Sequence, residues 1–385
     1  MAEENKQLLS TLITTCASTL AGLKRPRTAS SSSSPASSEP PPSLADIRND
    51  TLALLHLVSK EVTNLSLALK PPVAQEAVKS TLDKLVDLVA KLRFAGEQLP
   101  VEGVLTKRIS WTAQESLESL SHLLSAALAS LTSSSSSPPA PAAAQKKSRD
   151  ALLVATKSFW SFVERAERMP RDELEATRGS WKDVLGMLDD CLEEMKEMGE
   201  GEDEEGEGEG EEGEAEEEPE GEDEDDDDDF SSSSSRPFTA EHRARITATY
   251  LLLRLTRLLI NCLFTRTSPS SLSTFSSTSP SLAASFSAPA FLSSAQRLVQ
   301  RLSALGDDVA AALEPPQRDL GETVEELCEV ADELAGEIEA AVGVAAEKGK
   351  EGEGEKGEEA RKAEREWLAM WRKQRDDARA KLDAI

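Results

Sequence analysis

The feature that most limits the fold of this chain is a pattern of apolar residues spaced three and four positions apart. A clear example is Leu55, Val58, Val62, Leu65 and Leu69. Such spacing places the side chains on one face of an α-helix, which must bury that face against another element. The pattern recurs along the chain, and aromatic residues, which strands favour, make up only 4% of it. The sequence therefore predicts an all-α protein of about ten amphipathic helices.

Stretches rich in Ser, Pro, Gly or acidic residues separate these helical segments. Because they lack the apolar residues that a core requires, we expect disorder at residues 132–147, 200–238 and 267–288. The remaining helices are most economically arranged as two antiparallel bundles. The expected organisation is an N-terminal helix and Ser/Pro linker at 1–43, a first bundle at 44–199, an acidic and Ser-rich linker at 200–238, a second bundle at 239–347, and a spacer with a C-terminal amphipathic helix at 348–385.

The segment that leads into the acidic linker has an apolar stripe that is nearly a coiled-coil seam. Its regularly spaced members include Trp181, Leu188 and Met195. We expect the helix from Trp181 to Met195 to pack into the first bundle. Because glycine and carboxylates follow it almost without interruption, we expect the chain to lose order at about Gly199.

The net charge of −28 is concentrated in one run. Residues 200–229 carry 22 carboxylates and no basic residue, which leaves −6 for the rest of the chain. This run is either a docking tail for histones and other basic proteins or a solvated insert that is too polar to fold. Elsewhere the sequence has no basic face with interleaved aromatic residues, so we expect no direct binding of nucleic acid.

No catalytic or metal-binding motif is recognisable in the sequence. The cysteines and histidines stand singly at unrelated helical positions: Cys16, Cys191, Cys262 and Cys328, and His56, His122 and His242. A lone Cys on an apolar stripe is usually a small core residue, and the scattered thiols indicate a reducing compartment. Phosphate-binding, zinc-protease and nucleophile-elbow motifs do not occur. We therefore expect no catalytic residue, no cofactor and no metal.

The most apolar stretch, "ITATYLLLRLTRLLINCLF", is expected to be a core helix and not a membrane span. Arg254 and Arg257 interrupt it, and one such charge at the centre of a bilayer costs about 2.5–3.5 kcal/mol. The first residues, "MAEENKQLL", are acidic and lack the basic-then-apolar order of a secretory signal, so we expect no signal peptide.

Three short features allow two interpretations each. "KPP" at 70–72 separates two helices, which form either a helix-loop-helix dimerisation unit without a basic region or an ordinary hairpin within a bundle. Trp367 and Trp371 form either an exposed partner-binding ridge or the contact that docks the last helix on the second bundle. "KRPR" at 24–27 is either a nuclear-import signal or ordinary linker composition.

Four blocks of sequence carry a family resemblance: "LHLVSKEVTNLSLALKPP", "TKSFWSFVERAERMPRDEL", "VLGMLDDCLEEMKEM" and "ALGDDVAAALEPPQ". In this order they resemble the cyclin-D-binding protein family, including its fungal members, over most of residues 44–199 and more weakly over 240–345. The resemblance implies a two-bundle, all-helical protein of nucleus and cytoplasm. It also implies a negative regulator of the cell cycle and transcription that binds D-type cyclins and helix-loop-helix factors without contacting DNA. The family's short acidic Cys-Asp element is missing after Trp160, so we expect no contact of that kind.

The sequence thus predicts a non-enzymatic regulator that binds cyclin-like or helix-loop-helix-type proteins through helical surfaces, away from membranes. The alternative is an acidic chaperone or scaffold that binds histones or other basic proteins through residues 200–229. The sequence leaves the oligomeric state open. The residues expected to bind partners or to define the core are Val62, Leu65, Leu69, Trp160, Trp181, Leu188, Trp367 and Trp371.

Overall fold

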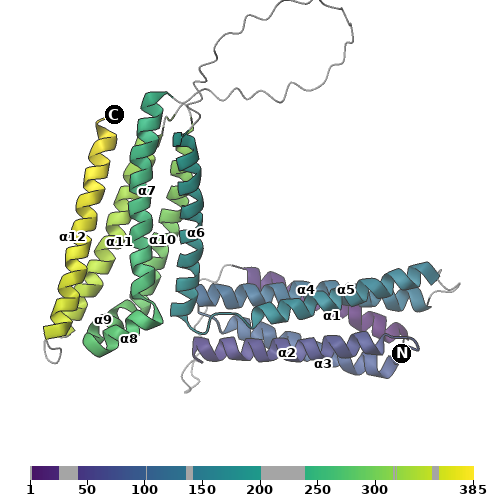
Figure 1. The fold of residues 1–385 in the computed structure, drawn as a ribbon. Coiled ribbons are helices and arrows are strands. Elements are labelled where there is room, and N and C mark those ends of the chain that lie inside the picture. Colours follow the sequence, from purple (N-terminus) through teal and green to yellow (C-terminus); the bar gives the residue numbers. More distant parts are fainter. Residues whose placement is uncertain are drawn as a thin grey trace, which may run out of the picture. The chain divides into compact units, whose positions relative to one another are not determined.

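The computed structural model describes residues 2–25, 42–100, 102–135, 142–200, 239–314, 317, 319–348 and 355–385. These residues form twelve α-helices and no strand, which confirms the predicted all-α fold (Figure 1). The chain divides into two compact units, Met1–Ser180 (unit 1) and Trp181–Ile385 (unit 2). Each unit buries its own apolar stripes.

Unit 1 is a bundle of five helices followed by the first turns of a sixth. The five are α1 (Ala2–Lys24), α2 (Leu44–Ala68), α3 (Gln75–Glu97), α4 (Val104–Ser135) and α5 (Ala142–Ala166). α4 contacts each of the other four, α1 lies against α3 and α4, and α2 lies against α3 and α5. The N-terminal helix is therefore part of this bundle, although we expected the bundle to begin at residue 44.

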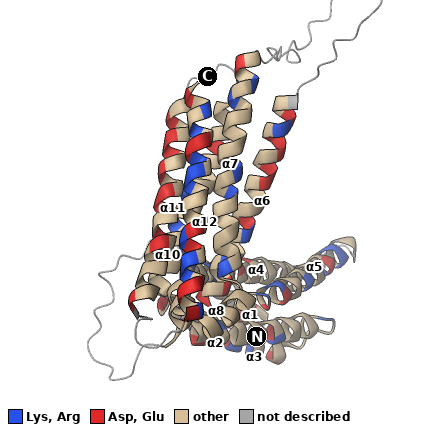
Figure 2. Ribbon diagram, turned by 60° about the vertical axis from the view of Figure 1, so that its left-hand side comes forward, with Lys and Arg blue, Asp and Glu red and all other residues tan. Residues whose placement is uncertain are grey.

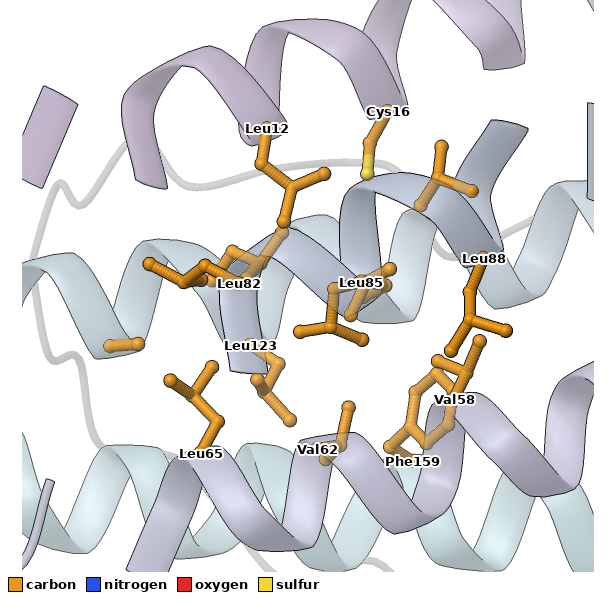
Figure 3. Close-up of a cluster of buried hydrophobic side chains, with 14 of the residues drawn as sticks. Leu12, Cys16, Val58, Val62, Leu65, Leu82, Leu85, Leu88, Leu123 and Phe159 are labelled. Carbon is orange, nitrogen blue, oxygen red and sulfur yellow. The ribbon is translucent and has the colours of Figure 1, made fainter. Parts of the chain in front are cut away.

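The core of unit 1 is formed by the apolar stripes of its helices. Figure 3 shows buried side chains from all five: Leu12 and Cys16 of α1, Val58, Val62 and Leu65 of α2, Leu82, Leu85 and Leu88 of α3, Leu123 of α4, and Phe159 of α5. Full burial of one such Leu, Val or Phe side chain stabilises the fold by about 1.5–3 kcal/mol. Burial of the facing stripes, more than helix propensity, therefore holds the five helices together.

Two helix starts in unit 1 are fixed by side chains that cap them. The Ser43 Oγ accepts the N–H of Asp46 at 3.1 Å, and the Asp46 carboxylate accepts the N–H of Ser43 at 3.3 Å, which makes a capping box for α2. The Glu173 carboxylate accepts the N–H groups of Val104 and Leu105 at 2.6 and 3.0 Å. Because Glu173 stands at the start of α6, these bonds tie that start to the start of α4.

Unit 2 contains most of α6 and six further helices. They are α6 (Glu173–Glu200), α7 (Ala240–Arg266), α8 (Pro269–Thr278), α9 (Pro280–Phe286), α10 (Pro289–Ala312), α11 (Leu320–Lys348) and α12 (Glu355–Asp383). α11 packs along α10 and α9, and α12 packs against α7 and α11. Figure 2 shows charged residues along much of α12, whereas α7 is mostly free of them. α7 buries residues on most of its length, among them Leu252, Leu259 and Leu263.

α7 is the one helix among the described residues that is long and apolar enough to cross a membrane. Of its most apolar window, 56% is buried inside the structure. Burial of this extent is typical of the core helix that we expected from the two arginines within the stretch.

The expectation of a disordered insert at residues 267–288 was wrong. α8 and α9 occupy most of this segment, and Pro269 and Pro280 stand at their first turns. Proline is favoured there because its missing N–H would have no partner within the helix. In the insert expected at 132–147, α4 continues to Ser135 and α5 begins at Ala142, which leaves residues 136–141 outside the described part.

The helix that leads into the acidic run is α6, and we expected it to pack into the first bundle from Trp181 onwards. This expectation was wrong, because the boundary between the units falls inside α6, after Ser180. Trp181 is fully buried in unit 2. Leu188 lies over Gly306 of α10, where a Cβ would come within 2.8 Å of the Leu188 Cδ2. Its neighbour Asp189 forms an ion pair with Arg257 of α7. The apolar stripe thus specified which face of α6 is buried, but not in which bundle. Residues 201–238, which include nearly all of the acidic run, lie outside the described part.

Candidate protein-interaction surface

Four large apolar side chains are exposed on neighbouring parts of α2 and α5. They are Leu67 (65% exposed), Leu153 (53%), Val154 (69%) and Trp160 (42%), and we call Leu67, Leu153 and Trp160 the α2–α5 face. The two helices run antiparallel, because Thr63 and Ser66 of α2 contact Trp160 and Thr156 of α5 in reverse order. Leu153 lies two turns before Trp160 on the same side of α5, so it falls beside the end of α2 that carries Leu67. Leu67, Leu153 and Trp160 therefore lie along one seam, whereas Val154 lies on the side of α5 that it shares with Arg165, which pairs with Glu115 of α4.

Polar contacts along the seam between the two helices hold this patch in position. The Trp160 Nε1–H donates to the Thr63 Oγ1 at 3.1 Å, and the Thr63 hydroxyl donates to the Ser59 carbonyl at 2.8 Å. One turn away, the Ser66 and Thr156 hydroxyls are hydrogen-bonded at 2.7 Å. The indole ring is thus fixed at its polar edge while much of its apolar surface stays accessible, a geometry that suits binding.

Six of the eight residues predicted to bind partners or define the core are buried. Val62, Leu65 and Leu69 lie in unit 1, and Trp181, Leu188 and Trp371 lie in unit 2. The stripe of α2 is therefore used inside unit 1, and the helices on either side of "KPP" form an ordinary hairpin of the bundle. Only Trp160 and, in part, Trp367 reach the surface.

The two tryptophans of α12 dock this helix on unit 2. The Trp371 Nε1–H donates to the Leu255 carbonyl of α7 at 2.8 Å, and the ring is buried. The guanidinium carbon of Arg266 lies 5.2 Å from the centre of the Trp367 ring, within cation–π range. Of the two interpretations given above, the docked helix is the one that the structure contains, and no free tryptophan ridge exists on α12.

The sequence reasoning missed most of the α2–α5 face. Leu67, Leu153 and Val154 lie outside the buried stripes of their helices, so the spacing of those stripes does not predict them. An apolar residue on the polar side of an amphipathic helix was the available signal. Trp111 of α4, which is 57% exposed, was missed for the same reason.

The thiols of the chain are poorly suited to chemistry. Burial raises the pKa of Cys16 and of Cys262 to about 12. Burial, with a smaller effect of Asp307, raises the pKa of Cys191 to about 11. The thiolate is the nucleophilic and metal-binding form, so these three cysteines are unreactive at neutral pH. Within the part of the chain that the structure describes, no three His, Cys, Asp or Glu side chains come together as a metal site.

The comparisons with known proteins bear on the region that contains the α2–α5 face. Residues 50–201 match a family model described as "Grap2 and cyclin-D-interacting, N-terminal". The matched range includes all of α3, α4, α5 and α6 and most of α2. The search of curated proteins gave no match to the chain.

Proposed function

We propose that the chain is a regulator that binds a cyclin-type protein on the α2–α5 face, and we start from the match of residues 50–201 to the Grap2 and cyclin-D-interacting, N-terminal, family model. The observation that carries the proposal is the patch of Leu67, Leu153 and Trp160, which lies within the matched range. Exposed aromatic and aliphatic clusters of this kind are typical of the centres of protein interfaces, where a few residues contribute most of the binding energy and tryptophan is enriched among them. The core of unit 1 is complete without these side chains.

The proposed mechanism is occupation of a partner's surface and involves no reaction. A rigid helical face that covers a cyclin or a helix-loop-helix-type factor would keep that factor from its other partners. By this route the protein would restrain the cell cycle and transcription, in the cytoplasm and in the nucleus. The support is the family match of residues 50–201 and the position of the face on the surface of unit 1.

The proposal is tested by measuring the binding of a purified D-type cyclin to the full chain by calorimetry. Leu67→Glu and Leu153→Glu place a charge in the face, and we expect each to weaken binding at least about tenfold, because a buried, unpaired carboxylate is costly. Val86→Glu on α3 is the matched control, since Val86 is also exposed and lies off the face. Equal loss of binding in the control and the face variants would contradict the proposal.

A second variant separates this function from binding through the acidic run. We expect the chain that lacks residues 201–229 to bind the cyclin as tightly as the full chain does, and to lose any salt-sensitive binding of histones. If deletion abolishes cyclin binding, the function belongs to the acidic run and not to the α2–α5 face.

A further inference from the structure

A groove of about 840 Å³ lies in unit 1, where the C-terminal ends of α1 and α3 meet the first turns of α4. Its volume is within the range of about 300–1,000 Å³ that is usual for ligand sites. Buried Thr19 and Leu99 form part of its lining, and the exposed indole of Trp111 stands on one side. The groove is separate from the α2–α5 face, which is made by other helices.

The shape of the groove is set by close packing of α1 on α3. Leu23 of α1 lies over Gly96 of α3, where an added Cβ would be only 2.5 Å from the Leu23 Cδ2. Gly96 therefore lets the end of α1 approach α3 more closely than any other residue would allow. Because both helices are anchored in the core of unit 1, the groove is a preformed feature of the bundle.

The charges that line the groove are mostly positive. Arg25, Arg93 and Lys107 line it together with one carboxylate, Glu97. Arg93 is already paired with Glu97, whose Oε1 is 2.8 Å from the Arg93 Nε. Arg25 and Lys107 form no ion pair with any described residue, so two cations remain available beside Trp111.

We propose that this groove binds a short acidic segment of a partner protein, with an apolar side chain against Trp111 and carboxylates on Arg25 and Lys107. The indole supplies a large apolar contact, and the two cations supply charge-assisted hydrogen bonds. A nucleic acid is a weaker candidate, because the two unpaired cations of the groove are few for a long polyanion, whereas a short peptide brings only a few carboxylates. The proposal does not depend on the cyclin-binding role of the α2–α5 face.

The test is fluorescence anisotropy with the full chain and a labelled peptide of about ten residues, in which glutamates flank one leucine. We expect the double variant Arg25→Glu/Lys107→Glu to weaken binding at least about tenfold. The matched control is Lys60→Glu/Lys70→Glu, which makes the same change of charge on α2 and the turn after it. We expect the control to change the affinity less than about twofold in 0.15 M salt, where the Debye length is about 8 Å.

Two further measurements address the apolar contact and the class of ligand. We expect Trp111→Ala in the protein, and serine in place of the leucine in the peptide, each to weaken binding about fivefold or more. The proposal is overturned if the control double variant weakens binding as much as the groove variant, or if both apolar changes leave the affinity unchanged. It is also overturned if a labelled single-stranded oligonucleotide binds the chain more tightly than the peptide and loses its binding in the groove variant. All substituted side chains are exposed, and unchanged thermal unfolding of the variants will establish that the fold is kept.

Discussion

Unit 1 and unit 2 are both helical bundles, yet their surfaces differ. Unit 1 has 21 basic and 19 acidic side chains, whereas unit 2 has 22 basic and 52 acidic, of which 22 lie at residues 200–229. The aromatic side chains that are exposed among the described residues, Phe94, Trp111 and Trp160, all belong to unit 1. Interfaces favour aromatic residues and are poor in acidic ones, so the composition of unit 1 suits the proposed partner binding better than that of unit 2 does.

The helices that complete the two bundles, α1 in unit 1 and α12 in unit 2, also differ in how apolar their buried faces are. α1 closes unit 1 through apolar residues such as Leu9 and Leu12, both fully buried. α12 closes unit 2 with few apolar residues, chiefly Leu368 and Trp371, and with an ion pair between Arg266 and Glu364 that is largely buried. A single tryptophan therefore carries much more of the packing in unit 2 than any one residue carries in α1.

The largest expected effect follows from this contrast between Trp371 and Trp160. We expect Trp371→Ala to lower the free energy of unfolding of unit 2 by about 3–5 kcal/mol, since it removes a buried ring and the hydrogen bond to Leu255. Trp160→Ala in unit 1 should cost about 1 kcal/mol or less, because much of the ring is already exposed. Urea denaturation followed by far-UV circular dichroism measures both. Equal losses would mean that Trp160 is a core residue and not part of an interface.

The next effect concerns two glycines that admit a leucine from a neighbouring helix. Gly96 admits Leu23 in unit 1 and Gly306 admits Leu188 in unit 2, where an added Cβ would lie 2.5 and 2.8 Å from the leucine. We expect Gly306→Ala to destabilise unit 2 by about 1–3 kcal/mol through overpacking, because Leu188 is buried, and Gly96→Ala to cost unit 1 less, because the half-buried Leu23 can move its Cδ2 aside.

Gly186 on α6 provides the matched control for these substitutions, because an added Cβ there meets nothing within 4 Å. Alanine is the better helix former, so Gly186→Ala should stabilise unit 2 by about 0.5–1 kcal/mol. Thermal unfolding of the three variants gives the signs. If Gly306→Ala also stabilises, then α6 is not held against α10 as closely as the structure has it.

A smaller effect, which the two units should share, comes from their buried thiols. Cys16 in unit 1 and Cys262 in unit 2 each have a pKa of about 12, against 9.0 for a free thiol. Above pH 9 the unfolded chain gives up these protons while the folded chain keeps them, so stability falls as the pH rises. At pH 10 each thiol should account for a loss of about 1 kcal/mol.

The measurement is the slope of the unfolding free energy between pH 8 and 10 in the native chain and in Cys16→Ala and Cys262→Ala. Each substitution should make the slope less negative by the amount that the deprotonation of one thiol contributes to it. This holds whatever the substitution does to the stability at pH 8. An unchanged slope would mean that water reaches the thiol in the folded state.

The sequence predicted the buried faces of the helices better than it predicted their partners. The spacing of Leu55, Val58 and Val62 is sufficient to place them in a core, because an apolar stripe must be buried somewhere. The stripe of α6 has the same property, but nothing in its spacing distinguishes the two bundles, and Trp181 was therefore assigned to the wrong one. A composition rich in Ser and Pro predicts a linker, but a proline at the first turn, such as Pro269, also begins a helix.

The candidate surface was harder to predict for a related reason. Trp160 was named because its block resembles a family, and its exposure could not be known before α2 and α5 were seen side by side. Leu67 and Leu153 become a patch only when two segments far apart in the sequence are joined. Spacing within one helix contains no information about such a patch.

The smallest expected effect tests whether surface charge, rather than Trp371, holds α12 in unit 2. Arg372 of α12 and Glu339 of α11 form an ion pair at 2.8 Å, with 35% and 51% of their side chains exposed. Arg165 and Glu115 form the corresponding exposed pair in unit 1, between α5 and α4, at 2.9 Å. A double-mutant cycle with alanine at each position should give a coupling of about 0.2–1 kcal/mol in either unit, because solvent and salt screen such pairs. The coupling should fall further in 1 M salt, where the Debye length is about 3 Å. A coupling in unit 2 well above that in unit 1 would mean that charge does more than the buried indole to hold α12, and would reverse the contrast between the two bundles.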